Sequence, residues 1–201
     1  MSNVKIAHKD NTKQCVVYAD SSLPSVVRVI GEGNKVCSVT SLGDEMFVAR
    51  AWSQIEVYDA KTFELRRPIA LCELNDFHLG LVVCPHNNCL YVSDWGNASV
   101  HRIDLSSRSR DTVKKWSVAY RPYSLSVNSD NNLIVVSEGE PISYLSYLSI
   151  SKLQIFTTDG ALLQVILLHA GIKTPSHAVQ LPTGEFLISH VGSLNCLFSG
   201  S

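Results

Sequence analysis

The densest group of metal-ligating side chains in this sequence is a six-residue segment that begins at Cys84, ends at Cys89 and contains His86. Two thiolates and an imidazole suit zinc, but a structural zinc site needs four ligands in a tetrahedral array. No second pair of ligands follows at a zinc-binding spacing. We therefore interpret the segment as a turn between two strands and expect no metal site there.

Motifs for nucleophilic catalysis and phosphate binding are absent from the sequence. It contains no Gly-x-Ser-x-Gly segment, no P-loop and no Gly-x-Gly-x-x-Gly segment. These motifs supply an exposed serine nucleophile or a backbone cradle for phosphate groups. The sequence thus predicts no catalytic residue, and it favours a protein that is not an enzyme without deciding the question.

Four polar residues occupy the same position after a short apolar run: Arg50, Asp94, Glu138 and His190. If the runs are equivalent strands, these side chains form a partial ring at one end of the sheets, which suits a ligand-binding face. We add Trp95, which follows Asp94, to these candidate binding residues. The alternative is that the two acids accept hydrogen bonds from the next turn and serve the fold. Both interpretations stay open at this point.

The apolar runs themselves recur at a regular spacing. The runs that end at Arg50, Asp94 and Glu138 are 44 residues apart, and the run that ends at His190 follows after 52 more. An insertion at residues 140–151 explains the longer interval. Each repeat holds four short apolar segments between turns rich in Asn, Asp and Gly, with almost no helical periodicity. Four-stranded antiparallel sheets repeated at about 40–50 residues are typical of β-propeller blades.

The sequence therefore predicts an all-β fold, a partial β-propeller with four-stranded antiparallel blades. We expect one domain over residues 1–201, with blades at about 36–76, 77–120 and 121–173 and an incomplete blade at 174–201. Residues 1–35 are expected to be strands of a preceding blade. A β-sandwich with regularly spaced strands is the alternative.

Several segments resemble NHL and YWTD-type propeller repeats. They are residues 92–97 with 100–104, residues 121–127, where Ser124 stands in place of the usual glycine, and residues 174–179. The resemblance implies a six-bladed, TolB-like propeller, of which this chain is an incomplete copy of about three and a half to four blades. It also implies that four residues at the start of the innermost strands line the mouth of a central channel: His78, Arg121, Tyr123 and His177.

Composition narrows the classes of partner. Hydrophobic residues make up 45% and charged residues 17%, which suits a folded domain, and the net charge is −1. Such a balance gives no overall attraction to DNA or to an anionic membrane. The N-terminus has no apolar segment of a secretory signal, and the six cysteines are scattered. We therefore expect a cytoplasmic protein with reduced thiols and no membrane partner.

We expect a non-catalytic binding scaffold for protein partners that needs no cofactor. One alternative is an RNA-binding surface of the NHL type, with a basic patch at Arg102, Lys114 and Lys115. These charges can also be explained without RNA, as solvent-exposed side chains at the outer rim of a blade. A second alternative, implied by propeller lactonases, is a hydrolase with calcium in its channel. Its candidate ligands are Glu138, Asn128 and Asp94.

Overall fold

The computed structural model describes residues 6–7, 15–19, 25–30, 35–51, 54–71, 80–106, 113–143, 146–169, 171–172, 174–190 and 193–198. Within these ranges, the side chains of residues 6–7, 15–30, 70, 113, 138–150 and 193–198 are not described. All of the regular elements in the described ranges are β-strands. No helix in this part of the chain is long and apolar enough to cross a membrane.

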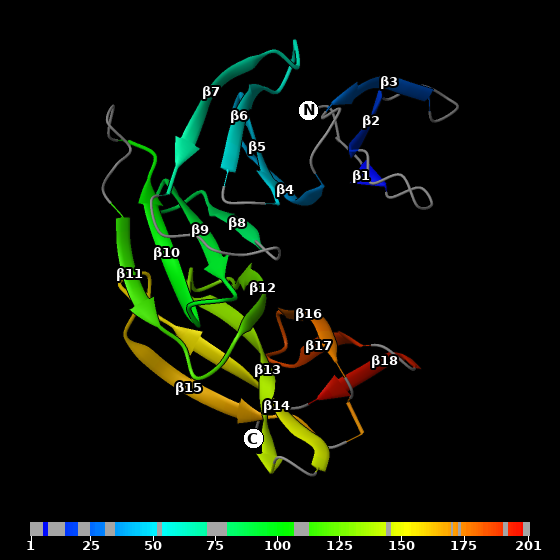
Figure 1. Cartoon of the computed structure of the whole chain (residues 1–201), viewed down its shortest axis with the longest axis vertical. Helices are drawn as coiled ribbons and strands as arrows, with labels where there is room; N and C mark the ends of the chain where they lie inside the picture. The colour runs from blue at the N-terminus through cyan, green and yellow to red at the C-terminus, as the bar shows by residue number, and fades with distance from the viewer. Residues whose placement is uncertain are drawn as a thin grey trace.

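The strands form five antiparallel sheets (Figure 1). The first holds β1 (Ile6–Ala7), β2 (Cys15–Ala19) and β3 (Ser25–Ile30). The second holds β4 (Val36–Leu42), β5 (Glu45–Arg50), β6 (Gln54–Asp59) and β7 (Leu65–Ala70). The third holds β8 (Leu81–Cys84), β9 (Cys89–Asp94), β10 (Ser99–Asp104) and β11 (Val113–Ser117).

The fourth sheet holds β12 (Pro122–Val127), β13 (Leu133–Ser143), β14 (Ser146–Phe156) and β15 (Leu162–Leu167). The fifth holds β16 (Pro175–Gln180), β17 (Phe186–His190) and β18 (Ser193–Phe198). In each sheet the strands pair in chain order. The expectation of an all-β fold with four-stranded antiparallel units is thereby confirmed.

In the second to fifth sheets, the first strand lies on the inside. Strand β4 contacts β8, β8 contacts β12, and β12 contacts β16. Strands β7, β11 and β15 lie on the outside (Figure 1). The sheets thus stand side by side around a common inner row of strands.

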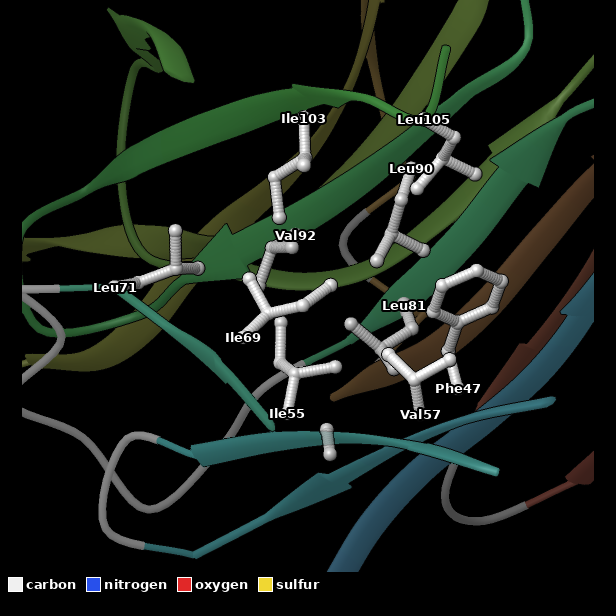
Figure 2. Packing of buried hydrophobic residues seen from close by; sticks show 11 residues of the cluster. Phe47, Ile55, Val57, Ile69, Leu71, Leu81, Leu90, Val92, Ile103 and Leu105 are labelled. Atoms are coloured by element: carbon white, nitrogen blue, oxygen red, sulfur yellow. The ribbon is translucent and has the colours of Figure 1, made fainter. Parts of the chain in front are cut away.

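The second strand of each unit supplies much of the core because it is covered on both faces. Every residue of β9 is buried. Leu90 and Val92 belong to the cluster between the second and third sheets, which Figure 2 shows. Cys89 and Tyr91 belong to the cluster between the third and fourth sheets. Alternate side chains of a strand point to opposite faces, so one continuous apolar run fills two cores.

The insertion at residues 140–151 lengthens a hairpin instead of forming a separate element. Strands β13 and β14 have 11 residues each, whereas β9 and β10 have 6 each. Pairing continues beyond the body of the sheet, with Glu140 opposite Ile150 and Ser143 opposite Ser146, and it includes register shifts. The extra residues therefore extend this hairpin beyond the end of the fourth sheet.

Three hairpins close with the same turn. Its first residue donates its N–H to the carbonyl of the fifth and accepts a hydrogen bond from the fourth, at residues 128–132, 157–161 and 181–185. The fourth residue has a positive φ: 64° at Asn131, 88° at Gly160 and 89° at Gly184. Glycine and asparagine tolerate this left-handed conformation, which explains the residue types found there.

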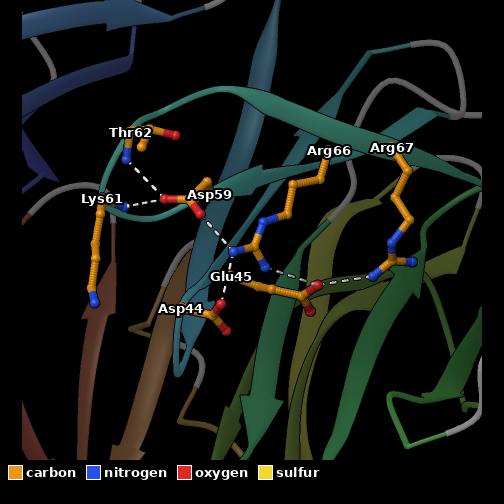
Figure 3. Close-up of polar contacts among 7 residues, drawn as sticks. All are labelled: Asp44, Glu45, Asp59, Lys61, Thr62, Arg66 and Arg67. Carbon is orange, nitrogen blue, oxygen red and sulfur yellow. Dashed lines mark hydrogen bonds and ion pairs between the residues drawn. The ribbon is translucent and has the colours of Figure 1, made fainter.

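The outermost strands differ in how their free edges are protected. Strand β7 carries Arg66, Arg67 and Pro68; Arg66 lies 2.7 Å from Asp44, and Arg67 lies 3.0 Å from Glu45 (Figure 3). Strand β11 carries two lysines. Strand β15 has neither charge nor proline, and it exposes Leu162, Leu163, Val165 and Leu167 at 51%, 54%, 45% and 64%. Because charges and proline discourage edge-to-edge pairing, β15 is the least protected of these three strands.

Candidate interaction surface

Two connections meet at one end of the third sheet, where several of the predicted binding residues lie. The turn from β9 to β10 contains Trp95, and the connection from β11 to β12 contains Tyr120 and Arg121. The N–H of Val118 donates to the carbonyl of Ala98 at 2.9 Å and holds the two connections together. The structure therefore brings Trp95 and Arg121, which are 26 positions apart in the sequence, into contact.

Arg121 stacks on aromatic rings. Its guanidinium carbon lies 4.0 Å from the centroid of the Trp95 ring and 5.6 Å from that of Tyr120. We call these three residues the Arg121 cluster. Such a contact is electrostatically favourable because the face of an aromatic ring carries negative charge. Tyr123, at the start of β12 in the fourth sheet, is 45% exposed and follows Arg121 by two positions.

His177 joins the inner strands of two neighbouring sheets. Its Nδ1 makes a short hydrogen bond with the Ser124 hydroxyl of β12. Two further bonds continue along these strands: Ser126 Oγ donates to the carbonyl of Ala178 at 2.6 Å, and Asn128 Nδ2 donates to Gln180 Oε1 at 2.8 Å. We call this row the inner-strand ladder. Desolvation lowers the pKa of His177, which favours the neutral imidazole.

Asp94 is fully buried and its oxygens are occupied within its own sheet. Oδ2 lies 3.1 Å from His101 Nε2, and it accepts a hydrogen bond from Asn97 Nδ2 at 2.8 Å. Oδ1 accepts the Asn97 backbone N–H at 3.2 Å. Burial alone would raise the pKa of Asp94, but the bonds from His101 and Asn97 outweigh it and hold the pKa below its ordinary value. These contacts favour the role of fixing the turn that carries Trp95.

Arg50 is also engaged inside its sheet. Its Nε lies 2.6 Å from Glu56 Oε2, and its Nη2 donates to the Tyr58 hydroxyl at 3.4 Å. Burial alone would lower the pKa of Arg50, but the bonds to Glu56 and Tyr58 raise it. Because Arg50 is only 6% exposed, we conclude that its bonds to Glu56 and Tyr58 stabilise the packing of β5 on β6.

Three predicted binding residues remain, and the side chain of one of them is described. His190 is half-buried at the end of β17. His78 lies outside the described residues, and Glu138 lies in β13 with a side chain that is not described. Among the predicted residues, the described contacts thus join Arg121 to Trp95, and they tie His177 to Ser124, the neighbour of Tyr123 in β12.

The predicted basic patch is not one continuous surface. Arg102 and Lys114 are register partners, so their side chains share a face of the third sheet, whereas Lys115 pairs with His101 on the opposite face. Lys114 Nζ lies 2.8 Å from Asp159 Oδ1, and Arg102 Nη1 lies 3.9 Å from the same oxygen. Two of the three cations therefore face a carboxylate of the neighbouring sheet.

The segment from Cys84 to Cys89 forms the hairpin turn between β8 and β9. The two cysteines are opposite each other at the ends of these strands and are both buried. Asn87 Nδ2 donates to Cys84 Sγ at 3.2 Å, and burial raises the pKa of the Cys89 thiol. In the described part of the chain, no three His, Cys, Asp or Glu residues gather as metal ligands would.

Comparison with known proteins adds a fold assignment to this geometry. No protein-family model matches the chain, and no curated protein matches it. Among solved structures, the WD40 β-propeller domain of Doa1 superimposes with a TM-score of 0.72 at 13% identity, covering 98% of this chain and 63% of that one. The fold is a β-propeller.

A second propeller domain agrees, and one further solved structure superimposes. The β-propeller domain of Myceliophteria thermophila Cps50 (Swd1) gives a TM-score of 0.60 at 11% identity, covering 94% of this chain and 67% of that one. Kuenenia stuttgartiensis hydrazine synthase gives 0.63 at 17% identity, covering 81% and 44%. The chain spans less than two thirds of the Doa1 domain and of hydrazine synthase, so its sheets correspond to part of each of these structures. The matches support the propeller fold, and the NHL/YWTD type stays a prediction.

Two features of these propeller blades were not predicted from the sequence. The inner-strand ladder uses Ser124, Ser126 and Asn128, which alternate with apolar residues. This alternation predicts that one face of β12 is polar, so the sequence did contain a signal for the ladder. The stack of Arg121 on Trp95 had no local signal because it joins two separate connections.

Proposed function

We propose that this chain is a non-catalytic, protein-binding β-propeller scaffold with repeats of the NHL/YWTD type. Its binding surface is the end of the blade β8–β11 that carries the Arg121 cluster, together with the start of β12. The observation that carries the proposal is the contact of the Arg121 guanidinium with the Trp95 ring at 4.0 Å, two positions before the exposed Tyr123 in the sequence. Tryptophan, tyrosine and arginine are the residue types that dominate binding energy at protein interfaces.

The scaffold supports this surface by rigidity. The turn that carries Trp95 is fixed by the buried Asp94, and the inner strand that follows Arg121 is tied to β16 by the inner-strand ladder. Side chains held in place before binding lose less conformational entropy when a partner arrives. The WD40 and Cps50 propeller matches support a scaffold of this general kind.

Site-specific photo-crosslinking tests this proposal. A benzophenone amino acid is placed at Tyr123 and, as a control, at Lys61, which is exposed in the turn between β6 and β7. We expect protein adducts at position 123 that an excess of unlabelled protein competes away, and none of these adducts at position 61. The same adducts at both positions, or adducts to nucleic acid alone, would contradict a protein-binding role for this end.

A further inference from the structure

We propose that Arg121 is the anchor for a carboxylate side chain in an acidic segment of the partner protein, an inference that rests on the proposed protein-binding function. The inference starts from a difference among the arginines. Within the part of the chain whose side chains are described, four arginines lie within 4 Å of a carboxylate: Arg50, Arg66, Arg67 and Arg102. Arg121 makes no hydrogen bond or ion pair with any described residue and contacts rings instead.

The donors of Arg121 remain available to bind an anion. A guanidinium carries five N–H donors in a planar fork, and the described residues accept none of those of Arg121. Two parallel N–H groups on such an edge match the two oxygens of a carboxylate. The rings of Trp95 and Tyr120 fix the group beforehand, since they limit the rotamers that Arg121 can adopt.

No described side chain neutralises the positive charge of Arg121. Asp94, next to Trp95 in the sequence, is fully buried and already accepts hydrogen bonds from its own turn. The imidazole of His177 is engaged by the Ser124 hydroxyl of β12. Tyr123, two positions after Arg121 in the sequence, offers an exposed aromatic ring. The complementary ligand therefore carries a carboxylate next to an apolar or aromatic group.

An acidic peptide fits this surface better than RNA does. RNA binding needs several cations along the backbone track, because each phosphate contact contributes only part of the affinity. Lys114 and Arg102 face Asp159, and Lys115 lies on the other face of the sheet from them. A single stacked guanidinium matches one carboxylate and not a run of phosphates.

Fluorescence anisotropy on the full chain tests the anchor directly. The probe is the fluorescein-labelled pentapeptide Gly-Glu-Phe-Glu-Gly, and the neutral comparison is Gly-Gln-Phe-Gln-Gly. We expect the acidic peptide to bind more tightly, and Arg121→Gln to weaken it about tenfold, since a hydrogen-bonded charge pair is lost. Lys61→Gln removes one positive charge far from the Arg121 cluster and is expected to change the affinity by less than about twofold.

Two more variants separate stacking from charge. Arg121→Lys keeps the charge but loses the planar fork, so we expect a loss of about threefold or more. Trp95→Leu keeps Arg121 but removes the ring beneath it, so we expect a loss of similar size. Circular dichroism confirms that each variant is folded before its affinity is compared.

Four results would overturn the inference: equal affinity for the two peptides, equal losses in Arg121→Gln and Lys61→Gln, binding of an eight-nucleotide oligouridylate but not the acidic peptide, or no peptide binding at all. The crosslinking experiment shows which proposal has failed. Protein adducts at position 123 without acidic-peptide binding would remove the carboxylate anchor and keep the scaffold. The absence of both would remove both.

Discussion

Replacing Gly160 by alanine is expected to destabilise the protein more than the same change at Gly184. Both glycines occupy the fourth position of the same turn, with φ of 88° and 89°. An alanine Cβ at Gly184 would meet no atom within 4 Å, whereas at Gly160 it would lie 2.6 Å from Cδ2 of Trp116. The two positions therefore share the backbone strain and differ in packing.

The difference can be estimated from these contacts. Alanine in the left-handed region costs about 1–2 kcal/mol at either position. At Gly160 the indole must also move, yet Trp116 packs edge-on against Tyr91, with centroids 6.1 Å apart, and against Phe156 at 6.2 Å. Overpacking of this kind costs about 1–3 kcal/mol. We therefore expect Gly160→Ala to cost about 1–3 kcal/mol more than Gly184→Ala.

Urea unfolding followed by circular dichroism measures the two free energies of unfolding. As a second arm, Trp116→Leu should remove most of the extra cost at Gly160, because the clashing ring is then gone. A difference below about 0.5 kcal/mol between the two alanine variants would show that the Trp116 ring yields freely, and the packing argument would be wrong.

The other expectations concern charge, edges and the core. Asp94→Asn should lower the free energy of unfolding by about 2–4 kcal/mol in urea titrations at pH 7, since buried donors lose a charged acceptor, and Asp104→Asn should lower it much less. The folded pKa of Asp94 is depressed, so its contribution is present above the unfolded value near 4 and is lost as the pH falls toward the folded value; a pH series on Asp94→Asn that is as steep as that of the wild type would contradict this. Because β15 is the least protected of the three outer strands, we expect its edge to promote self-association, and Val165→Lys should lower the mass measured by light scattering; an equal mass for both proteins would contradict this. Phe47→Ala should cost about 3–5 kcal/mol in the same urea assay, and Leu65→Ala, at an exposed position, should cost clearly less.

The fold could be predicted from the sequence because its signals are local and repeated. Strand β9 is a continuous apolar run, and equivalent runs 44 residues away gave the same prediction independently. The place of the insertion was also clear, since it interrupts the period. Its form was not clear, because a loop and a lengthened hairpin at residues 140–151 need the same number of residues.

The candidate site was less accessible for a physical reason. Residue types indicated that Arg121 and Trp95 suit a binding surface, but their stacking depends on how two connections meet across the end of a blade. Arg50 and Asp94 look equivalent in sequence to other polar positions, and only the partners Glu56 and His101 show that these charges are satisfied within the blade. Spacing locates a side chain along the chain, whereas its partners come from the neighbouring strand.

The bonds between neighbouring blades also bear on how the chain acquires its structure during synthesis. They join residues about one repeat apart: 43 positions between Leu81 and Ser38, 45 between Lys114 and Asp159, and 52 between Asn128 and Gln180. A ribosome that adds about 5–20 residues per second completes 44 residues in roughly 2–9 s. A new blade has time to dock on its predecessor while translation continues, and we therefore expect stepwise assembly from the N-terminal side with short-range contacts at each step.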